Sequence, residues 1–82
     1  MLETGFKSVS ASVALMRPGE SGIVTSCHSH DHHILKKLMA MGIIPGISLK
    51  LEQSFPAFVI KVGNTRLAFD VEIAKAIYVR IQ

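Results

Sequence analysis

The amino-acid sequence predicts a mainly β protein, a small five-stranded barrel that carries one α-helix. The chain has 82 residues, of which 49% are hydrophobic and 18% charged, so it suits one compact domain rather than a disordered segment. A single cysteine excludes an intrachain disulfide, and such a small core must then be stabilised by its own packing. The apolar residues fall in short alternating runs between turn signals, which predicts short strands. Closing such strands into a barrel leaves no sheet edge exposed to pair with other chains.

The first part of the chain combines an extension with the first strand. Residues 1–12 are rich in serine, threonine and glycine and lack regular apolar spacing, so we expect a flexible extension there and a single domain over 13–82. Pro18 and Gly19 indicate a turn, because proline fixes φ and glycine accepts positive φ. The β-branched residues that follow predict a strand over 22–27.

A helix is predicted at about 31–41, where the apolar residues recur at helical spacing. Its apolar stripe, expected to close one end of the barrel, consists of Ile34, Leu35, Leu38 and Met41. Ser29 or Asp31 can accept the free N–H groups of the first turn. Gly42 stands where a left-handed residue would end the helix, and Pro45 prevents its continuation.

The second half of the chain predicts four more strands and a short helical turn. Alternating apolar residues indicate strands over 47–54, 57–62, 65–69 and 77–81. Gly63 and Asn64 form a two-residue hairpin signal between the second and third of these. Asp70 can cap a helical turn over 71–76. With the strand over 22–27, these segments supply the five strands of the barrel.

The charge pattern and the residue types disfavour several function classes. The formal net charge is +3, and the nine Lys and Arg residues are scattered along the sequence with few aromatic residues, so a nucleic-acid partner is not favoured. No Ser/His/Asp set, phosphate-binding loop or carboxylate pair stands at catalytic spacing, which indicates a non-enzymatic protein. No apolar run reaches the ~20 residues that span a bilayer, and no signal-peptide pattern opens the chain, so we expect a cytoplasmic protein.

All four histidines and the only cysteine lie between residues 27 and 33. Imidazole nitrogen and thiolate sulfur are zinc ligands, so the candidate metal set is Cys27, His28, His30, His32 and His33. Structural zinc sites usually take ligand pairs from two separated elements, and the sequence offers no second pair. A polar loop that enters the helix, with no cofactor required, is therefore the favoured interpretation. The alternative is a weak zinc site shared by two chains of a homodimer.

Three motifs resemble the FeoA family of small cytoplasmic proteins. They are Pro18-Gly19-Glu20, the run Leu35-x-x-Leu38-x-x-Met41-Gly42-Ile43-x-Pro45-Gly46, and Ala74-x-x-Ile77-x-Val79. The resemblance covers about 15–81, and its most specific part is 38–46, where a helix, a glycine stop and a Pro-Gly turn follow in order. It implies an SH3-like barrel and a role in bacterial ferrous iron uptake.

The resemblance also implies a partner. We expect a non-enzymatic adaptor that binds and modulates the cytoplasmic part of a FeoB-like membrane GTPase, which would recruit it to the inner face of the membrane. The partner-binding residues expected on this basis are Lys37, Leu38, Met39, Met41, Gly42, Pro45 and Gly46. Met39 lies off the apolar stripe and is the best candidate for an exposed apolar contact, since methionine adapts its shape to a partner.

The sequence departs from the family pattern at several positions, one of which reverses a charge. Lys37 and Met41 stand where the family often has arginine and leucine, and Phe69-Asp70 replaces a common Leu-Arg pair. Such changes leave the expected fold intact and alter what a partner meets. The alternative function is an SH3-like regulatory or nucleic-acid-binding module unrelated to transport.

Overall fold

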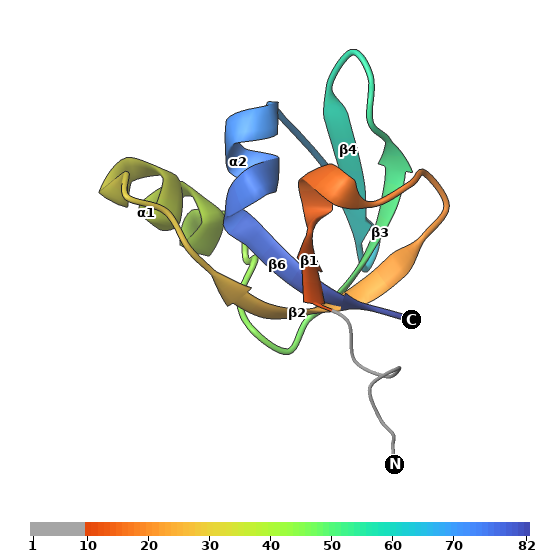
Figure 1. Cartoon of the computed structure of the whole chain (residues 1–82), viewed down its shortest axis with the longest axis horizontal. Helices are drawn as coiled ribbons and strands as arrows, with labels where there is room; N and C mark the ends of the chain where they lie inside the picture. Colours follow the sequence, from red (N-terminus) through yellow and green to blue (C-terminus); the bar gives the residue numbers. More distant parts are fainter. Residues whose placement is uncertain (1–9) are drawn as a thin grey trace.

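The computed structural model describes residues 10–82, which form one antiparallel sheet and three short helices (Figure 1). The elements in chain order are β1 (Ser10–Ser12), the 3-10 helix η1 (Val13–Leu15), β2 (Ser21–Cys27), α1 (His32–Ala40), β3 (Ser48–Gln53), β4 (Phe58–Val62), β5 (Thr65–Phe69), α2 (Val71–Ala76) and β6 (Ile77–Ile81). In the sheet the strands follow the order β1-β6-β2-β3-β4-β5. The predicted mainly β fold, its helix near 31–41 and the short helix over 71–76 are confirmed.

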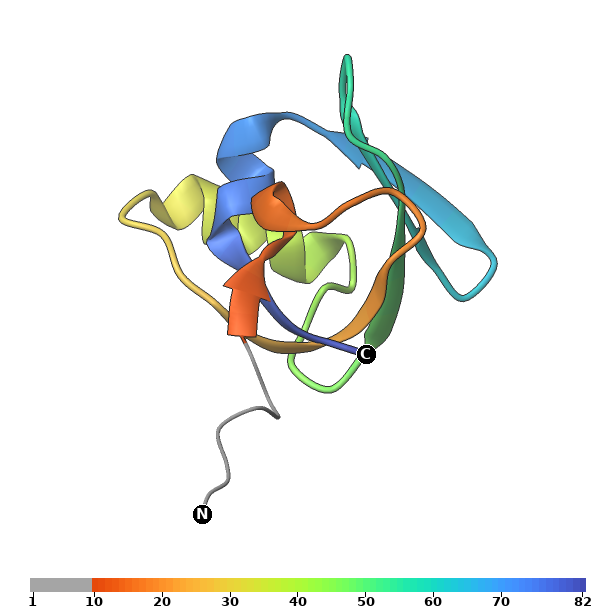
Figure 2. The ribbon, with the colours of Figure 1, turned by 45° about the vertical axis from the view of Figure 1, so that its right-hand side comes forward.

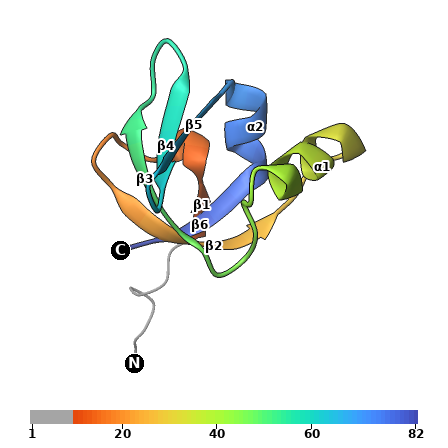
Figure 3. The ribbon, with the colours of Figure 1, turned by 180° about the vertical axis from the view of Figure 1, so that it is seen from behind.

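The sheet curls into a small barrel with the helices on one side. Figure 2 shows α2 over one end of the curled sheet, with α1 beside it. Seen from behind, α1 and the β3–β4–β5 segment lie at opposite sides of the molecule (Figure 3). No helix among residues 10–82 is long and apolar enough to cross a membrane.

Two sequence predictions need correction at the start of the chain. The sheet has six strands instead of five, because Ser10–Ser12 pairs with β6, with Ser10 opposite Arg80 and Ser12 opposite Tyr78. The predicted extension over 1–12 is therefore wrong for its last three residues, and its remainder, 1–9, lies outside the described residues. The segment Ser-Ala-Ser carries no apolar alternation, so only its pairing with β6 identifies it as a strand.

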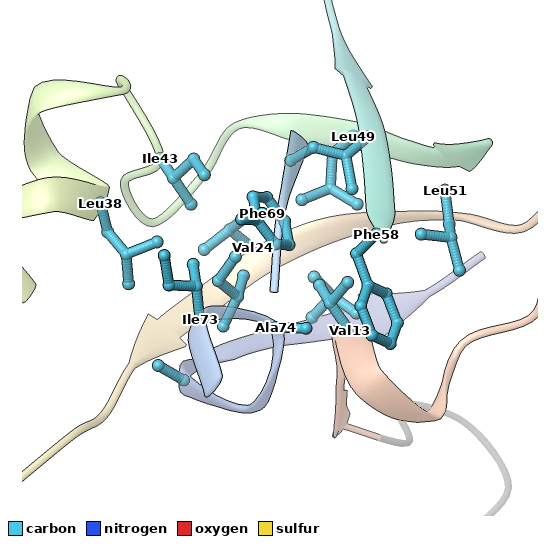
Figure 4. Close-up of a cluster of buried hydrophobic side chains, with 14 of the residues drawn as sticks. Val13, Val24, Leu38, Ile43, Leu49, Leu51, Phe58, Phe69, Ile73 and Ala74 are labelled. Carbon is cyan, nitrogen blue, oxygen red and sulfur yellow. The ribbon is translucent and has the colours of Figure 1, made fainter. Parts of the chain in front are cut away.

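The core is a single cluster of buried apolar side chains drawn from every strand except β1 and from every helix (Figure 4). Its members are Val13, Met16, Val24, Leu38, Ile43, Leu49, Leu51, Phe58, Ile60, Phe69, Ile73, Ala74, Ala76, Ile77 and Val79. In β3 and β4 the buried residues alternate with more exposed ones, as the sequence predicts for half-buried strands.

The apolar stripe of α1 contributes less to the core than the sequence indicates. Of its four residues only Leu38 is buried, whereas Ile34, Leu35 and Met41 remain partly exposed. The stripe therefore does not close the barrel end by itself. Three buried residues of α2 take much of that role, namely Ile73, Ala74 and Ala76. Ile43, just after α1, adds the side chain that lies next to Leu38 in Figure 4.

Candidate partner-binding groove

Of the two alternative N-cap residues that the sequence predicts, Ser29 or Asp31, the structure uses Asp31. Asp31 is the N-cap residue, and its Oδ1 accepts a hydrogen bond from the His33 backbone N–H at 2.9 Å. The Ser29 Oγ in turn accepts from the Asp31 N–H at 3.0 Å. These bonds satisfy the backbone N–H groups of Asp31, just before the helix, and of His33, in its first turn. They place His32 and His33 on the first turn of the helix, where both are exposed.

The end of α1 is a Schellman motif centred on Gly42. Gly42 has φ of +80°, a conformation that glycine adopts without steric cost. Its N–H donates to the Met39 carbonyl at 3.0 Å, and the Ile43 N–H donates to the Leu38 carbonyl at 2.9 Å. The buried side chains of Leu38 and Ile43 supply the apolar contact that accompanies this motif. The predicted stop at Gly42 is confirmed.

The loop after α1 is fastened to β2. The Gly46 N–H donates to the Val24 carbonyl at 2.8 Å, and the Val24 N–H donates to the Ile47 carbonyl, also at 2.8 Å. Gly46 has φ of +99°, which turns the chain into β3. The Cys27 Sγ reaches the Ile43 carbonyl at 3.8 Å. One wall of the region between α1 and β2 is thus fixed by the main chain.

An apolar groove of about 300 Å³ opens between α1 and this loop. It is lined by Cys27, Leu35, Leu38, Met39, Ile43, Ile44 and Pro45. Two apolar residues at this groove stand out into solvent, because Met39 is 70% exposed and Ile44 is 47% exposed. An apolar hollow with exposed apolar side chains is the kind of surface that binds a protein partner.

The predicted partner-binding residues divide into three groups. Leu38, Met39 and Pro45 line the groove. Gly42 and Gly46 shape the turns that build it. Met41 packs partly against the core, and Lys37 borders a separate cavity of about 230 Å³ between α1 and α2, lined by His33, Ile34, Lys37, Asp70, Glu72 and Ile73.

Sequence reasoning missed four lining residues of the groove: Cys27, Leu35, Ile43 and Ile44. Helical spacing places Leu35 in the apolar stripe, and the neighbouring histidines place Cys27 among the candidate metal ligands. The sequence does hold one indication of an exposed apolar residue here. Ile43 and Ile44 are adjacent before Pro45, and two adjacent side chains in a turn cannot both point into the core. In the structure Ile43 is buried and Ile44 exposed.

The candidate metal ligands do not form a cluster within one chain. Among residues 10–82, no group of three or more His, Cys, Asp or Glu side chains is arranged to hold a metal ion. His28 contacts Tyr78 edge-on, with ring centroids 5.5 Å apart, and His30, His32 and His33 are exposed. Burial raises the pKa of the Cys27 thiol, which opposes the thiolate that metal binding requires. A zinc site shared by two chains stays a prediction.

The basic residues are less scattered in the structure than in the sequence. Lys50 on β3 lies opposite Lys61 on β4, and Lys61 lies opposite Arg66 on β5. Directly opposed residues of an antiparallel sheet share a face. These three side chains therefore form one row across the outer face of the sheet, which we call the basic row.

A family model, a curated relative and a solved structure all relate this chain to FeoA proteins. The model of the FeoA domain matches residues 12–81. A Fe(2+) transport protein A from Leptolyngbya boryana is 34% identical over 79 residues, which are 95% of this chain and 96% of that protein. The crystal structure of an iron uptake regulatory protein, FeoA, superposes with a TM-score of 0.82 at 30% identity, covering 90% of this chain and 99% of the other.

More distant structures share the fold alone. FeoA of Stenotrophomonas maltophilia, solved with zinc and described as an SH3 domain protein, has a TM-score of 0.72 at 24% identity and covers 83% of this chain and 87% of its own. A manganese-dependent transcriptional repressor with bound manganese has a TM-score of 0.84 at 16% identity. It covers all of this chain, but only 40% of the repressor is matched. The barrel is therefore SH3-like, as expected.

Proposed function

Because the chain belongs to the FeoA family, which takes part in ferrous iron transport, we propose that it is a non-enzymatic adaptor of ferrous iron uptake. In this proposal it binds the cytoplasmic part of a FeoB-like membrane GTPase and modulates the assembly or activity of that transporter. A small barrel would thus act through contact with a larger protein and would need no cofactor of its own.

The observation that supports this proposal is the apolar groove beside α1. It joins the end of α1 and the Pro-Gly turn, which is the segment that carries the most specific family motif. Met39 exposes 70% of its surface although it is apolar. Burying a side chain of this size against a partner stabilises a complex by about 1.5–3 kcal/mol. An apolar segment of the transporter that occupies this groove would gain this stabilisation at Met39.

The proposal is tested by capture from the native cell with two matched variants. Met39→Asp puts a carboxylate into the groove, and Leu15→Asp makes the same type of change at a residue that is 74% exposed on η1, away from the groove. We expect the tagged wild-type chain and Leu15→Asp to retain the GTPase. Met39→Asp should retain at least about tenfold less, because a buried charge without a partner is costly. Circular dichroism checks that both variants fold.

Ferrous iron uptake by the same cells provides the functional measurement. We expect uptake to fall with Met39→Asp and to stay near the wild-type rate with Leu15→Asp. Equal capture and equal uptake for the two variants would exclude the groove as the binding surface. Recovery of nucleic acid instead of the GTPase, with a steep dependence on salt, would support the alternative regulatory function.

A further inference from the structure

The outer edge of β5 is open. β5 stands at one end of the sheet order and pairs with β4 alone. Within residues 10–82, no backbone hydrogen bond joins β5 to an element other than β4. An edge of this kind presents main-chain donors and acceptors that a further strand can pair with.

The register shows which groups point outward from β5. The two-residue turn between β4 and β5 places Val62 opposite Thr65, and such a turn pairs their main chains by hydrogen bonds. In an antiparallel ladder the hydrogen-bonded positions alternate, so Thr65, Leu67 and Phe69 pair with β4. The N–H and C=O groups of Arg66 and Ala68 therefore face the open edge.

The side chains beside this edge give it a net positive charge. The basic row of Lys50, Lys61 and Arg66 ends at β5. Glu52 is held in the same area by a hydrogen bond of 2.6 Å from the Arg66 Nε to its Oε1. That bond and the charges of the basic row keep the pKa of Glu52 below its usual value. Three positive charges thus face one negative charge, and the edge is left with a positive field.

The inner side of the same strand is partly apolar. Leu67 points to the face opposite Arg66 and is only half-buried. A strand placed beside β5 would put alternate residues next to Arg66 and Leu67, because side chains alternate between the two faces. The best match is an acidic residue beside Arg66 and an apolar residue beside Leu67.

We propose that the β5 edge binds an extended acidic segment of a partner protein by strand addition. The main chain of that segment would pair with Arg66 and Ala68, and its acidic side chain beside Arg66 would face the end of the basic row. A membrane surface fits less well, because lipid headgroups cannot complete the main-chain pairing. A second copy of this chain fits less well too, because it would bring two basic rows together.

This inference does not depend on the groove. β5 lies three positions from β2 in the sheet order, and Figure 3 shows it on the opposite side of the molecule from α1. The two surfaces can therefore be tested separately, and failure of one leaves the other standing.

The test uses the ¹⁵N-labelled full chain and two synthetic peptides, Glu-Val-Glu-Val-Glu and Lys-Val-Lys-Val-Lys. Titration followed by NMR should shift the amide signals of β5 with the acidic peptide and slow the hydrogen exchange of the Arg66 and Ala68 amides. We expect the acidic peptide to bind at least about tenfold more tightly than the basic one, since charge-assisted contacts are lost in the latter. Equal binding of the two peptides would overturn the proposal.

Protein variants separate charge from strand pairing. Arg66→Glu should weaken acidic-peptide binding about tenfold or more, and the control Lys75→Glu, the same charge change at an exposed residue of α2, should leave it near wild type. Ala68→Pro removes one outward N–H while the bonds to β4 stay, because that N–H faces the edge. It should abolish the slowed exchange at Arg66.

An N-methylated peptide and lipid vesicles distinguish strand addition from charge attraction alone. If Ala68→Pro unfolds the chain, an acidic peptide N-methylated at its central valine takes its place, since it loses a strand-pairing donor without any change in the protein. Undiminished binding of that peptide would show charge attraction without strand addition and overturn the proposal. Binding to phosphatidylglycerol vesicles that is lost with Arg66→Glu, together with no peptide binding, would assign the edge to the membrane instead.

Discussion

Gly22 lies where β2 is paired with both β3 and β6, and no side chain fits there. A Cβ atom at this position would stand 2.9 Å from the Arg80 carbonyl oxygen and 3.2 Å from the Val79 Cβ. The same residue is opposite Leu49 on β3 and Ile81 on β6. The close approach of three strands at this point therefore depends on the absence of a side chain.

Replacing Gly22 with alanine should destabilise the protein by forcing β2 and β6 apart. The neighbour that the new methyl group meets is main chain, which cannot rotate away, so we expect a loss of about 1–3 kcal/mol in the free energy of unfolding. Urea denaturation measures it. The control is Ser21→Ala, one residue earlier in β2, for which we expect a change within about 0.5 kcal/mol. A stability of Gly22→Ala equal to that of the control would contradict the steric explanation.

At the scale of elements, the two α-helices are capped alike and anchored differently. Asp31 caps α1, and Asp70 caps α2 by accepting from the Ile73 N–H at 3.2 Å. α2 buries three residues, while α1 buries Leu38 alone. Loss of α2 exposes three core side chains and loss of α1 only one, so we expect α1 to open locally more readily than α2.

Alanine at the two caps should accordingly give two different results. Each change removes a capping acceptor, a loss of about 0.5–2 kcal/mol. Asp70→Ala should lower the free energy of global unfolding, and Asp31→Ala should mainly speed amide hydrogen exchange within α1. The matched variants Asp31→Asn and Asp70→Asn keep an acceptor and should stay close to wild type. A global loss with Asp31→Ala as large as with Asp70→Ala would show that α1 is coupled to the core.

The sequence predicted the elements that carry their own local signals. The helix over 31–41 was found because its cap, glycine stop and apolar spacing agree, and the strand boundaries near 57–62 and 65–69 follow from Gly63 and Asn64. β1 was missed because its identity depends on pairing with β6. Leu38, Met39 and Pro45 of the groove were predicted, but its other lining residues and the basic row could not be, since only the loop conformation and the strand register bring those residues together.

At the scale of the whole molecule, β1 contributes to the stability of the sheet although the sequence gives no local signal for it. It covers one edge of β6, and its last residue, Ser12, is buried. A chain that begins at Val13 would leave that edge of β6 unpaired, whereas one that begins at Ser10 keeps it covered.

We expect residues 13–82 to unfold at a lower urea concentration than residues 10–82. Each lost ladder bond should cost about 1 kcal/mol, a large fraction of the stability of so small a domain. Urea denaturation of the two chains, followed by circular dichroism, measures the difference. Identical midpoints would show that β1 contributes nothing to the fold.

The pairing of β1 with β6 has a consequence for how this domain can be joined to others. The first and last strands run antiparallel side by side, with Ser10 opposite Arg80, so the chain enters and leaves the barrel at neighbouring points. A domain with adjacent entry and exit can be appended to a longer protein, or inserted into one, without distorting its core. The matched repressor, of which this fold makes up 40%, is an example of such modular use.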